Sequence, residues 1–258
     1  MPFRPEHRFG MMNSHSLCEA LAWDSEFFGR QVAHITAPAP TCVEMQEIFQ
    51  WCRSKKVDCL YFLADSQKQE CLTLAEEFGF HMVDIRLTLD RNLKRPALAA
   101  KCDAVRPFEE HDLGRLQEIA TVSHRDSRFY ADPNFPRDRC DELYRTWITK
   151  SFQGFADQVL VAAEMGQAVG YITCHLQENR VGKIGLFAVA ASAQGKALGR
   201  GLIHTALHWL LEQGMETVTV VTQARNLRAQ RAYQKCGFRT SAAQVWYHKW
   251  FNEKSARQ

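Results

Sequence analysis

Residues 194–201 read QGKALGRG, and an apolar stripe at helical spacing follows at once from Leu202 to Leu210. The stretch Lys183 to Val189 before them is apolar and of strand length, so the glycine-rich turn joins a strand to a helix. Backbone N–H groups in such a turn converge on an anion, and the helix N-terminus adds a favourable dipole. The turn therefore predicts a phosphate or pyrophosphate site, with a strain-relieving tight turn as the structural alternative. It does not match GxxxxGK(S/T), and no acidic ribose partner adjoins it, which disfavours a nucleotidase or a dinucleotide fold.

A weak internal repeat appears when Gly79-Phe80 is aligned with Gly237-Phe238. Each pair closes an apolar stripe with i, i+3, i+4, i+7 spacing, which predicts a helix ended by glycine. The stripes are Cys71, Leu74, Ala75 and Phe78 in the first copy, and Ala229, Ala232, Tyr233 and Cys236 in the second. In each copy a strand and an earlier amphipathic helix precede this helix. The alternation predicts an α/β fold, with a mixed sheet and crossover helices.

The length of 258 residues allows one large domain or two small ones. Residues 91–101 (RNLKRPALAAK) are polar, basic and contain proline, as expected of a connection. We therefore expect an N-terminal lobe over residues 1–95 and a second domain over residues 96–258. In the second domain, Asp112 is a good N-cap for a helix from Leu113 to about Val122.

Composition excludes several classes of protein. Hydrophobic residues make up 46% and charged residues 24%, which is typical of a globular chain. The net charge of +3 predicts neither a nucleic-acid footprint nor a polybasic membrane patch. Nine cysteines occur without a CxxC pair, so we expect reduced thiols rather than zinc ligands or disulfides. The sequence shows no signal-peptide core and no apolar run of membrane length, so we expect a cytoplasmic protein.

The elements after the turn resemble the GNAT superfamily of acetyltransferases. The pyrophosphate loop of that family is written (Gln/Arg)-x-x-Gly-x-(Gly/Ala), for which this chain supplies Gln194, Ala197 and Gly199. Ala197 replaces the first glycine, which is tolerable if it keeps a helical-type backbone angle. Asn226, Tyr233 and Gly237-Phe238 follow in the family's order, and the resemblance covers about residues 104–250. It implies a GNAT-like mixed sheet flanked by helices.

The resemblance also implies acetyl-CoA as co-substrate, with no metal. Strand 184–189 should splay from its neighbour, which leaves backbone groups for the pantetheine arm and for the thioester carbonyl. Asn226 is an N-cap by position, and by resemblance it also touches the pantetheine. The implied cofactor-binding residues are Phe187, Ala188, Val189, Gln194, Gly195, Lys196, Ala197, Leu198, Gly199, Arg200, Gly201 and Asn226.

Tyr233 has two interpretations. It lies on the apolar stripe of its helix, where a buried tyrosine is ordinarily part of the core. By resemblance it is the general acid that protonates the departing thiolate. The N-terminal copy has Ala75 at the equivalent position, Lys68 in place of Asn226, and no glycine turn. The full set therefore occurs in one copy, which favours the catalytic interpretation and predicts that the N-terminal lobe is a smaller, degenerate GNAT-like lobe.

A general base is not evident. The strand that carries a carboxylate in many GNAT enzymes has Leu186, Phe187 and Ala188 here, so we expect water to take the proton. His175 and Glu178 are candidate endpoints of such a relay, although an exposed polar residue on a strand is the favoured interpretation of each. His204 and His208 have i, i+4 spacing but lack the HExxH glutamate and a third ligand, so we expect surface histidines rather than a metal site.

The loop 124–136 combines rings, arginines and small polar groups, which would suit a nucleotide-linked sugar. We assign Arg128, Phe129 and Tyr130 to the substrate and expect Arg125 in solvent; the alternative is a packed irregular loop. Three passages resemble the branch of dTDP-fucosamine acetyltransferases: residues 21–29, residues 127–129 with the later Trp147-Ile148, and the helix 226–237. That branch implies acetylation of the amine of dTDP-4-amino-4,6-dideoxy-D-galactose, without nucleic-acid or membrane partners.

Two other classes of function stay open. A GNAT enzyme that acts on a peptide N-terminus or a polyamine would need an acidic acceptor site, which the arginines of the loop disfavour. A non-catalytic acyl-CoA sensor could lose Tyr233, which is present. A monomer and a homodimer are both compatible with the sequence.

Overall fold

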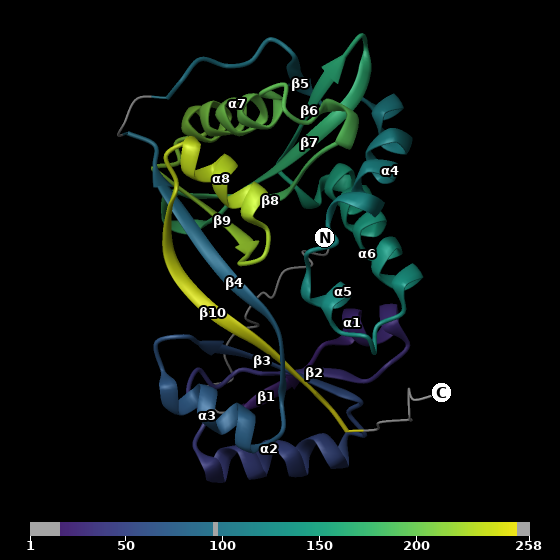
Figure 1. Ribbon diagram of the computed structural model, residues 1–258, viewed down its shortest axis with the longest axis vertical. Helices are drawn as coiled ribbons and strands as arrows, with labels where there is room; N and C mark the ends of the chain where they lie inside the picture. The colour runs from purple at the N-terminus through teal and green to yellow at the C-terminus, as the bar shows by residue number, and fades with distance from the viewer. Residues whose placement is uncertain (1–15, 95–97, 252–258) are drawn as a thin grey trace. The chain divides into compact units, whose positions relative to one another are not determined.

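The computed structural model describes residues 16–94 and 98–251 of the chain (Figure 1). The chain divides into two compact units. The C-terminal unit is Leu87–Ala242, and the N-terminal unit contains described residues 16–86 and 243–251. The boundary between residues 86 and 87 falls inside strand β4 (His81–Asn92), and the boundary between residues 242 and 243 falls inside strand β10 (Arg239–Trp250).

This division differs from the boundary expected at residues 95 and 96. The expected connection begins inside β4, where Arg91 is buried, and Leu93 is only 2% exposed in the core of the C-terminal unit. The second half of β10 pairs antiparallel with β3 (Cys59–Asp65), from Gln244 opposite Asp65 to Trp250 opposite Cys59. Strand pairing thus assigns the second half of β10 to the N-terminal unit, because it completes the backbone hydrogen bonds of β3.

In the N-terminal unit, α2 and α3 pack on one face of the sheet. Its strand order is β1-β2-β3-β10-β4, and β2 and β3 are parallel. Thr41 begins α2 with a capping box to Glu44. The apolar stripes of α2 and α3 are buried against Leu60, Phe62 and Val245 of the sheet. The other elements are β1 Cys18–Ala20, α1 Ala22–Phe28, β2 Val32–Ile35, α2 Cys42–Ser54 and α3 Gln69–Glu77.

The C-terminal unit is a mixed sheet flanked by helices, which confirms the predicted fold class. Its strand order is β10-β4-β9-β8-β7-β6-β5, with antiparallel pairs from β5 to β8 and a parallel pair β8–β9. Its other elements are β5 Val105–Pro107, η1 Glu110–Asp112, α4 Leu113–Ser123, α5 Arg128–Ala131, α6 Arg137–Lys150, η2 Ser151–Phe155, β6 Gln158–Glu164, β7 Gln167–Leu176, η3 Glu178–Arg180, β8 Val181–Val189, η4 Ala191–Ala193, α7 Leu198–Glu212, β9 Thr217–Gln223 and α8 Leu227–Lys235.

Neighbouring residues of β7 show how the two faces of this sheet are used. A Cβ on Gly170 would lie 3.2 Å from Leu202 of α7, whereas the next residue, Tyr171, hydrogen-bonds His124 at the end of α4. Since successive side chains of a strand point to opposite faces, α7 and α4 cover opposite faces of the sheet (Figure 1). The predicted apolar stripe of α7 is fully buried. Among the described residues, no helix has the length and apolar character of a membrane span.

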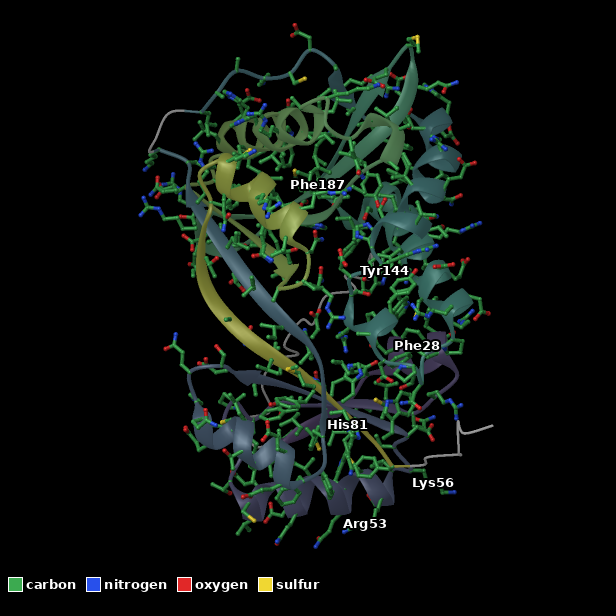
Figure 2. The ribbon with its side chains drawn as sticks, in the orientation of Figure 1. Phe28, Arg53, Lys56, His81, Tyr144 and Phe187 are labelled. Atoms are coloured by element: carbon green, nitrogen blue, oxygen red, sulfur yellow. The ribbon has the colours of Figure 1, made fainter. Side chains whose placement is uncertain are left out.

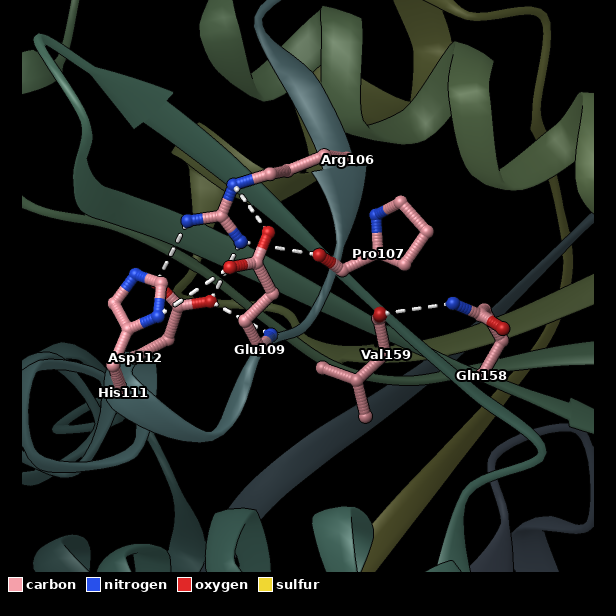
Figure 3. A network of polar contacts seen from close by, with 7 residues as sticks. All are labelled: Arg106, Pro107, Glu109, His111, Asp112, Gln158 and Val159. Carbon is pink, nitrogen blue, oxygen red and sulfur yellow. Dashed lines mark hydrogen bonds and ion pairs between the residues drawn. The ribbon is translucent and has the colours of Figure 1, made fainter.

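The entry into α4 is held by a buried carboxylate (Figure 3). Arg106 donates to both oxygens of Asp112, at 2.7 and 2.9 Å, and the Glu109 N–H donates to Asp112 at 2.9 Å. Burial alone would raise the pKa of Asp112, but these hydrogen bonds hold it below its ordinary value. Asp112 occupies the N-cap position of α4, as predicted, but its side chain makes no capping hydrogen bond to α4. Its backbone is already helical, and its side chain closes the preceding turn η1 instead.

Candidate active site

Strands β8 and β9 separate halfway along their length. They pair in parallel from Val181 opposite Thr217 to Ile184 opposite Val220, and β8 then continues to Val189 without β9 as its partner. On its other edge, β8 remains paired with β7 as far as Val189 opposite Gly170. The separation agrees with the expected splay, and it leaves one edge of residues 185–189 unpaired with β9.

A bulge sets which backbone groups face this unpaired edge. The register of β7 and β8 shifts between Ile172 and Cys174, and the Leu186 N–H donates to the Thr173 hydroxyl at 2.8 Å. The Ala190 N–H donates to Val169 O on β7 at 2.7 Å. Because backbone groups alternate along a strand, those of Ala188 also face β7, while those of Phe187 and Val189 face away from it. Among the three residues expected to bind cofactor here, the backbone of Ala188 is therefore already used.

The glycine-rich turn contains two residues in the left-handed region. Gly195 has φ +85°, and Ala197, the N-cap of α7, has φ +63° and ψ 0°. Ala197 therefore does not meet the condition of a helical-type backbone angle under which alanine would replace the family's glycine without strain. A left-handed residue with a Cβ costs roughly 1–2 kcal/mol relative to the right-handed helix region. Such strain persists where the surrounding structure determines the backbone, as at many ligand sites.

The first turn of α7 presents amide donors. The Gly201 N–H donates to Ala197 O at 3.0 Å, which is the first hydrogen bond of the helix ladder. The N–H groups of Leu198, Gly199 and Arg200 precede it and therefore have no acceptor within the helix. Such donors at a helix N-terminus suit an anion. Gly201 differs from Leu198, Gly199 and Arg200, because its amide is used and a Cβ there would lie 2.8 Å from Cys102.

Side chains tie this turn to β8 and α8. Gln194 donates to the Val189 carbonyl at 3.0 Å, and Arg228 donates to the side-chain oxygen of Gln194. Asn226 accepts the Ala229 N–H at 3.0 Å, which confirms its predicted role as the N-cap of α8. Lys196 is exposed and forms an ion pair with Glu164 at 2.9 Å. Sequence reasoning missed Arg228, because one arginine on a polar helix face has no distinguishing pattern.

Tyr233 lies on α8 against β8. It is 3% exposed, and its ring centroid is 5.6 Å from Phe187 and 5.4 Å from Phe238 (Phe187 is labelled in Figure 2). Burial raises the pKa of Tyr233, so the phenol stays protonated at neutral pH. Its hydroxyl makes no hydrogen bond to any residue that the structure describes. The residue thus belongs to the core by packing, and its proton is not committed to a described protein acceptor.

The rings of the acceptor loop pack against one another. Phe129 is 4% exposed and makes edge contacts with Phe135 and Trp147. Tyr130 is 7% exposed, stacks on Tyr144 and donates to Asp141. These two rings are therefore not open for stacking on a nucleotide, because their apolar area is already removed from water.

The arginines of the loop are more accessible than its rings. Arg128 is half-buried, with its guanidinium 4.3 Å from the Phe129 ring centroid. Arg125 is exposed, as expected. Of the three residues assigned to the substrate, Arg128 is the one whose side chain is not already buried.

The histidines differ from their expected surroundings. His175 is half-buried, and its Nε2 would lie 2.6 Å from a Cβ on Gly185 of β8. His208 donates from Nε2 to the Ala99 carbonyl oxygen over 2.8 Å, so it is not a free surface residue. His204 is half-buried, and desolvation lowers its pKa. Within the described parts of the chain, no three His, Cys, Asp or Glu side chains form a metal-binding group. Glu178 is exposed, as expected.

The sequence of this chain is similar to those of known acetyltransferases. Residues 119–238 match the acetyltransferase (GNAT) family. The chain is 26% identical over 239 residues to the dTDP-fucosamine acetyltransferase of Escherichia coli O6:H1, covering 90% of this chain and 97% of that protein. It is 31% identical over 144 residues to the spore coat polysaccharide biosynthesis protein SpsD of Bacillus subtilis, covering 56% of this chain and 50% of that protein.

A solved structure shows the same fold. The GCN5-related N-acetyltransferase from Sphaerobacter thermophilus superposes with a TM-score of 0.62 at 15% identity, covering 90% of this chain and 76% of that one. The strand separation, the glycine-rich turn and Tyr233 all lie within the residues that the family matches. Residues 119–238 are therefore an acetyltransferase domain of the GNAT family.

Proposed function

We propose that this enzyme transfers the acetyl group of acetyl-CoA to the amine of a nucleotide-linked amino sugar, dTDP-4-amino-4,6-dideoxy-D-galactose. The observation that carries this proposal is the similarity to the dTDP-fucosamine acetyltransferase, which extends over 97% of that protein and therefore includes both units. The arginines of the acceptor loop support an anionic acceptor over a peptide N-terminus or a polyamine.

The donor would bind along β8 and the first turn of α7. The amides of Leu198, Gly199 and Arg200 would receive the pyrophosphate, with Gly195 and Ala197 shaping the turn. The Phe187 C=O and the Val189 N–H would bond the pantetheine arm as an added strand, which leaves the Phe187 N–H for the thioester carbonyl. Asn226 and the Arg228–Gln194 contact would hold the end of α8 against this turn.

The reaction consists of attack on the thioester, departure of the thiolate, and return of Tyr233 to its protonated form. The neutral amine attacks the thioester carbonyl, a C–N bond forms, and a backbone N–H of β8 stabilises the oxyanion. The C–S bond then breaks, and the Tyr233 hydroxyl gives its proton to the sulfur. Water takes the proton that the amine loses, and solvent reprotonates Tyr233. The raised pKa of Tyr233 supports this role, because the group is in its acid form before each cycle.

The N-terminal unit would be a degenerate copy of this fold. It repeats the order helix, strand, helix, Gly-Phe and strand in α2, β3, α3, Gly79-Phe80 and β4. It has Ala75 where the second copy has Tyr233, and Lys68 where that copy has Asn226. We expect no acetyl transfer from this unit.

A thiol-release assay tests the proposal. The purified chain is incubated with acetyl-CoA and, in separate reactions, the dTDP-linked 4-amino sugar, the free amino sugar, a peptide with a free N-terminus, and spermidine. Of the four acceptors, we expect only the nucleotide sugar to give rapid thiol release from acetyl-CoA. Mass spectrometry should locate one acetyl group on the nitrogen of this sugar. Turnover of the peptide or of spermidine in preference to the sugar nucleotide would overturn the proposed acceptor.

A further inference from the structure

His124 ends α4 and is anchored to the sheet. Its Nε2 lies 2.8 Å from the hydroxyl oxygen of Tyr171 on β7. Its ring stacks on Tyr144 of α6, with centroids 4.5 Å apart and planes 15° from parallel (Tyr144 is labelled in Figure 2). Tyr171 is directly opposite Ala188 of β8. His124 is therefore fixed over the part of the sheet that neighbours the unpaired edge of β8.

The hydrogen bond determines the tautomer of His124. Tyr171 is fully buried, and among the described residues His124 is its one hydrogen-bond partner. If Nε2 carried a proton, the phenol proton would be buried without an acceptor, which is unfavourable. The phenol therefore donates to Nε2, and the proton of the neutral imidazole resides on Nδ1. Desolvation lowers the pKa of His124 to about 4, so the ring keeps this neutral form at physiological pH.

Nδ1 of His124 is left as a donor. This nitrogen makes no hydrogen bond to any residue within 16–94 or 98–251. His124 is half-buried, so part of its ring is accessible to a ligand. Arg125 and Arg128 follow His124 in the acceptor loop, so this donor and the two guanidinium groups belong to one short segment of the chain. A rigid neutral N–H suits an uncharged oxygen such as a sugar hydroxyl, whereas the arginines suit phosphate.

We propose that Nδ1–H of His124, oriented by Tyr171, donates a hydrogen bond to the acceptor hydroxyl next to the amine that is acetylated, and so selects the sugar. This inference rests on the proposed function. In a 4-amino-4,6-dideoxy sugar that hydroxyl is on C3, since C5 carries the methyl group and the ring oxygen. His124 thereby acts on specificity, and it takes no part in the proton transfers assigned to Tyr233 and water.

Two substitutions distinguish the roles of the two ring nitrogens of His124. H124Q places an amide near the position of Nε2, which keeps a partner for Tyr171 and removes the Nδ1 donor. H124N places an amide near Nδ1, which keeps the donor and leaves Tyr171 without its partner. We expect H124Q to raise KM for the nucleotide sugar about tenfold, as for one lost hydrogen bond of about 1.4 kcal/mol. The kcat of H124Q and its calorimetric affinity for acetyl-CoA should change little. H124N should have a KM close to that of the wild type, because it keeps the donor.

A substrate analogue without the C3 hydroxyl completes the experiment. The wild-type enzyme should bind the analogue as weakly as H124Q binds the normal substrate, and H124Q should not distinguish the two. An equal loss on removing the hydroxyl in both proteins would overturn the proposal. So would a KM for H124Q equal to that of the wild type.

Nitrogen-15 NMR of the folded protein provides a readout that needs no substrate. His124 should show a protonated, pyrrole-type Nδ1 and an unprotonated Nε2 at neutral pH, and Y171F should mix the tautomers. The opposite tautomer in the wild type would overturn the proposal even if the enzyme is active. Absence of turnover with every nucleotide sugar, together with the expected tautomer, would instead reject the proposed function.

Discussion

Arg91 and Lys249 occupy equivalent positions in the two repeats, and each binds the end of a helix that precedes a Gly-Phe pair. They stand twelve residues after Gly79 and Gly237, respectively. Arg91 on β4 donates to the Cys236 carbonyl at the end of α8, and Lys249 on β10 donates to the Gly79 carbonyl after α3, at 3.2 Å. Each last strand of a repeat therefore brings a cation to the C-terminal helix end of the other repeat, where the helix dipole favours it.

We expect these two cations to differ in their contribution to stability. Arg91 is buried and Lys249 is half-buried. Replacing Arg91 with Met should lower the free energy of unfolding by about 1.5–3 kcal/mol, because it removes a charge-assisted hydrogen bond to a buried carbonyl. The matched Lys249→Met change should cost about 1 kcal/mol or less, as for a partly exposed cation at a helix C-terminus. Urea unfolding of both variants measures this difference, and equal losses would contradict it.

Ala197→Gly should stabilise the glycine-rich turn. The left-handed backbone at Ala197 is strained for a residue with a Cβ and unstrained for glycine. The gain should be up to about 1 kcal/mol, because the greater freedom of glycine in the unfolded chain offsets part of the relief. Gly195→Ala, at φ +85°, is the matched control and should destabilise the protein. Thermal unfolding distinguishes these outcomes, and a loss of stability in Ala197→Gly would show that its backbone angle is not left-handed.

Gly199→Asp should weaken acetyl-CoA binding more than tenfold, or about 1.4 kcal/mol. The change adds a negative charge in the first turn of α7, and its Cβ would lie 3.3 Å from the Phe187 ring. Calorimetry of the folded variant measures the affinity. Gly199→Ala is the steric control, since it adds the Cβ without the charge. Unchanged affinity in Gly199→Asp would reject this turn as the pyrophosphate site.

Tyr233→Phe should reduce kcat by roughly 10²- to 10⁴-fold, because the leaving thiolate loses its proton donor. The ring contacts with Phe187 and Phe238 should remain, so the melting temperature and the acetyl-CoA affinity should change little. Steady-state kinetics with calorimetry on the same preparation provide the check. Near-normal turnover would leave Tyr233 with a packing role alone.

The Arg106–Asp112 pair should stabilise the folded protein at neutral pH and lose this contribution at acid pH. The pKa of Asp112 is lowered in the folded protein, so its contribution is complete above the ordinary aspartate pKa and is lost as pH falls through the folded value. Asp112→Asn should therefore unfold more readily at pH 7 and show a shallower loss of stability between about pH 5 and pH 2. Urea midpoints across this range test the slope, and parallel curves for the two proteins would contradict the assignment.

Local patterns in the sequence were sufficient for most elements. The predicted strand 183–189 lies within β8, and the stripe from Leu202 to Leu210 is the buried face of α7. Asn226 was identified as an N-cap because capping depends on residues a few positions apart. The order of turn, strand, asparagine and tyrosine likewise identified the acetyltransferase domain, since these signals are short and lie in sequence order.

Other features depend on partners far away in the sequence. The pairing of β10 with β3, and thus the division of the chain, joins segments about 180 residues apart. The burial of Phe129 and Tyr130 depends on α6. The His124–Tyr171 bond needs the end of α4 to meet β7. Neither side-chain periodicity nor motif spacing encodes such contacts, because they form only when the sheet and its flanking helices pack together.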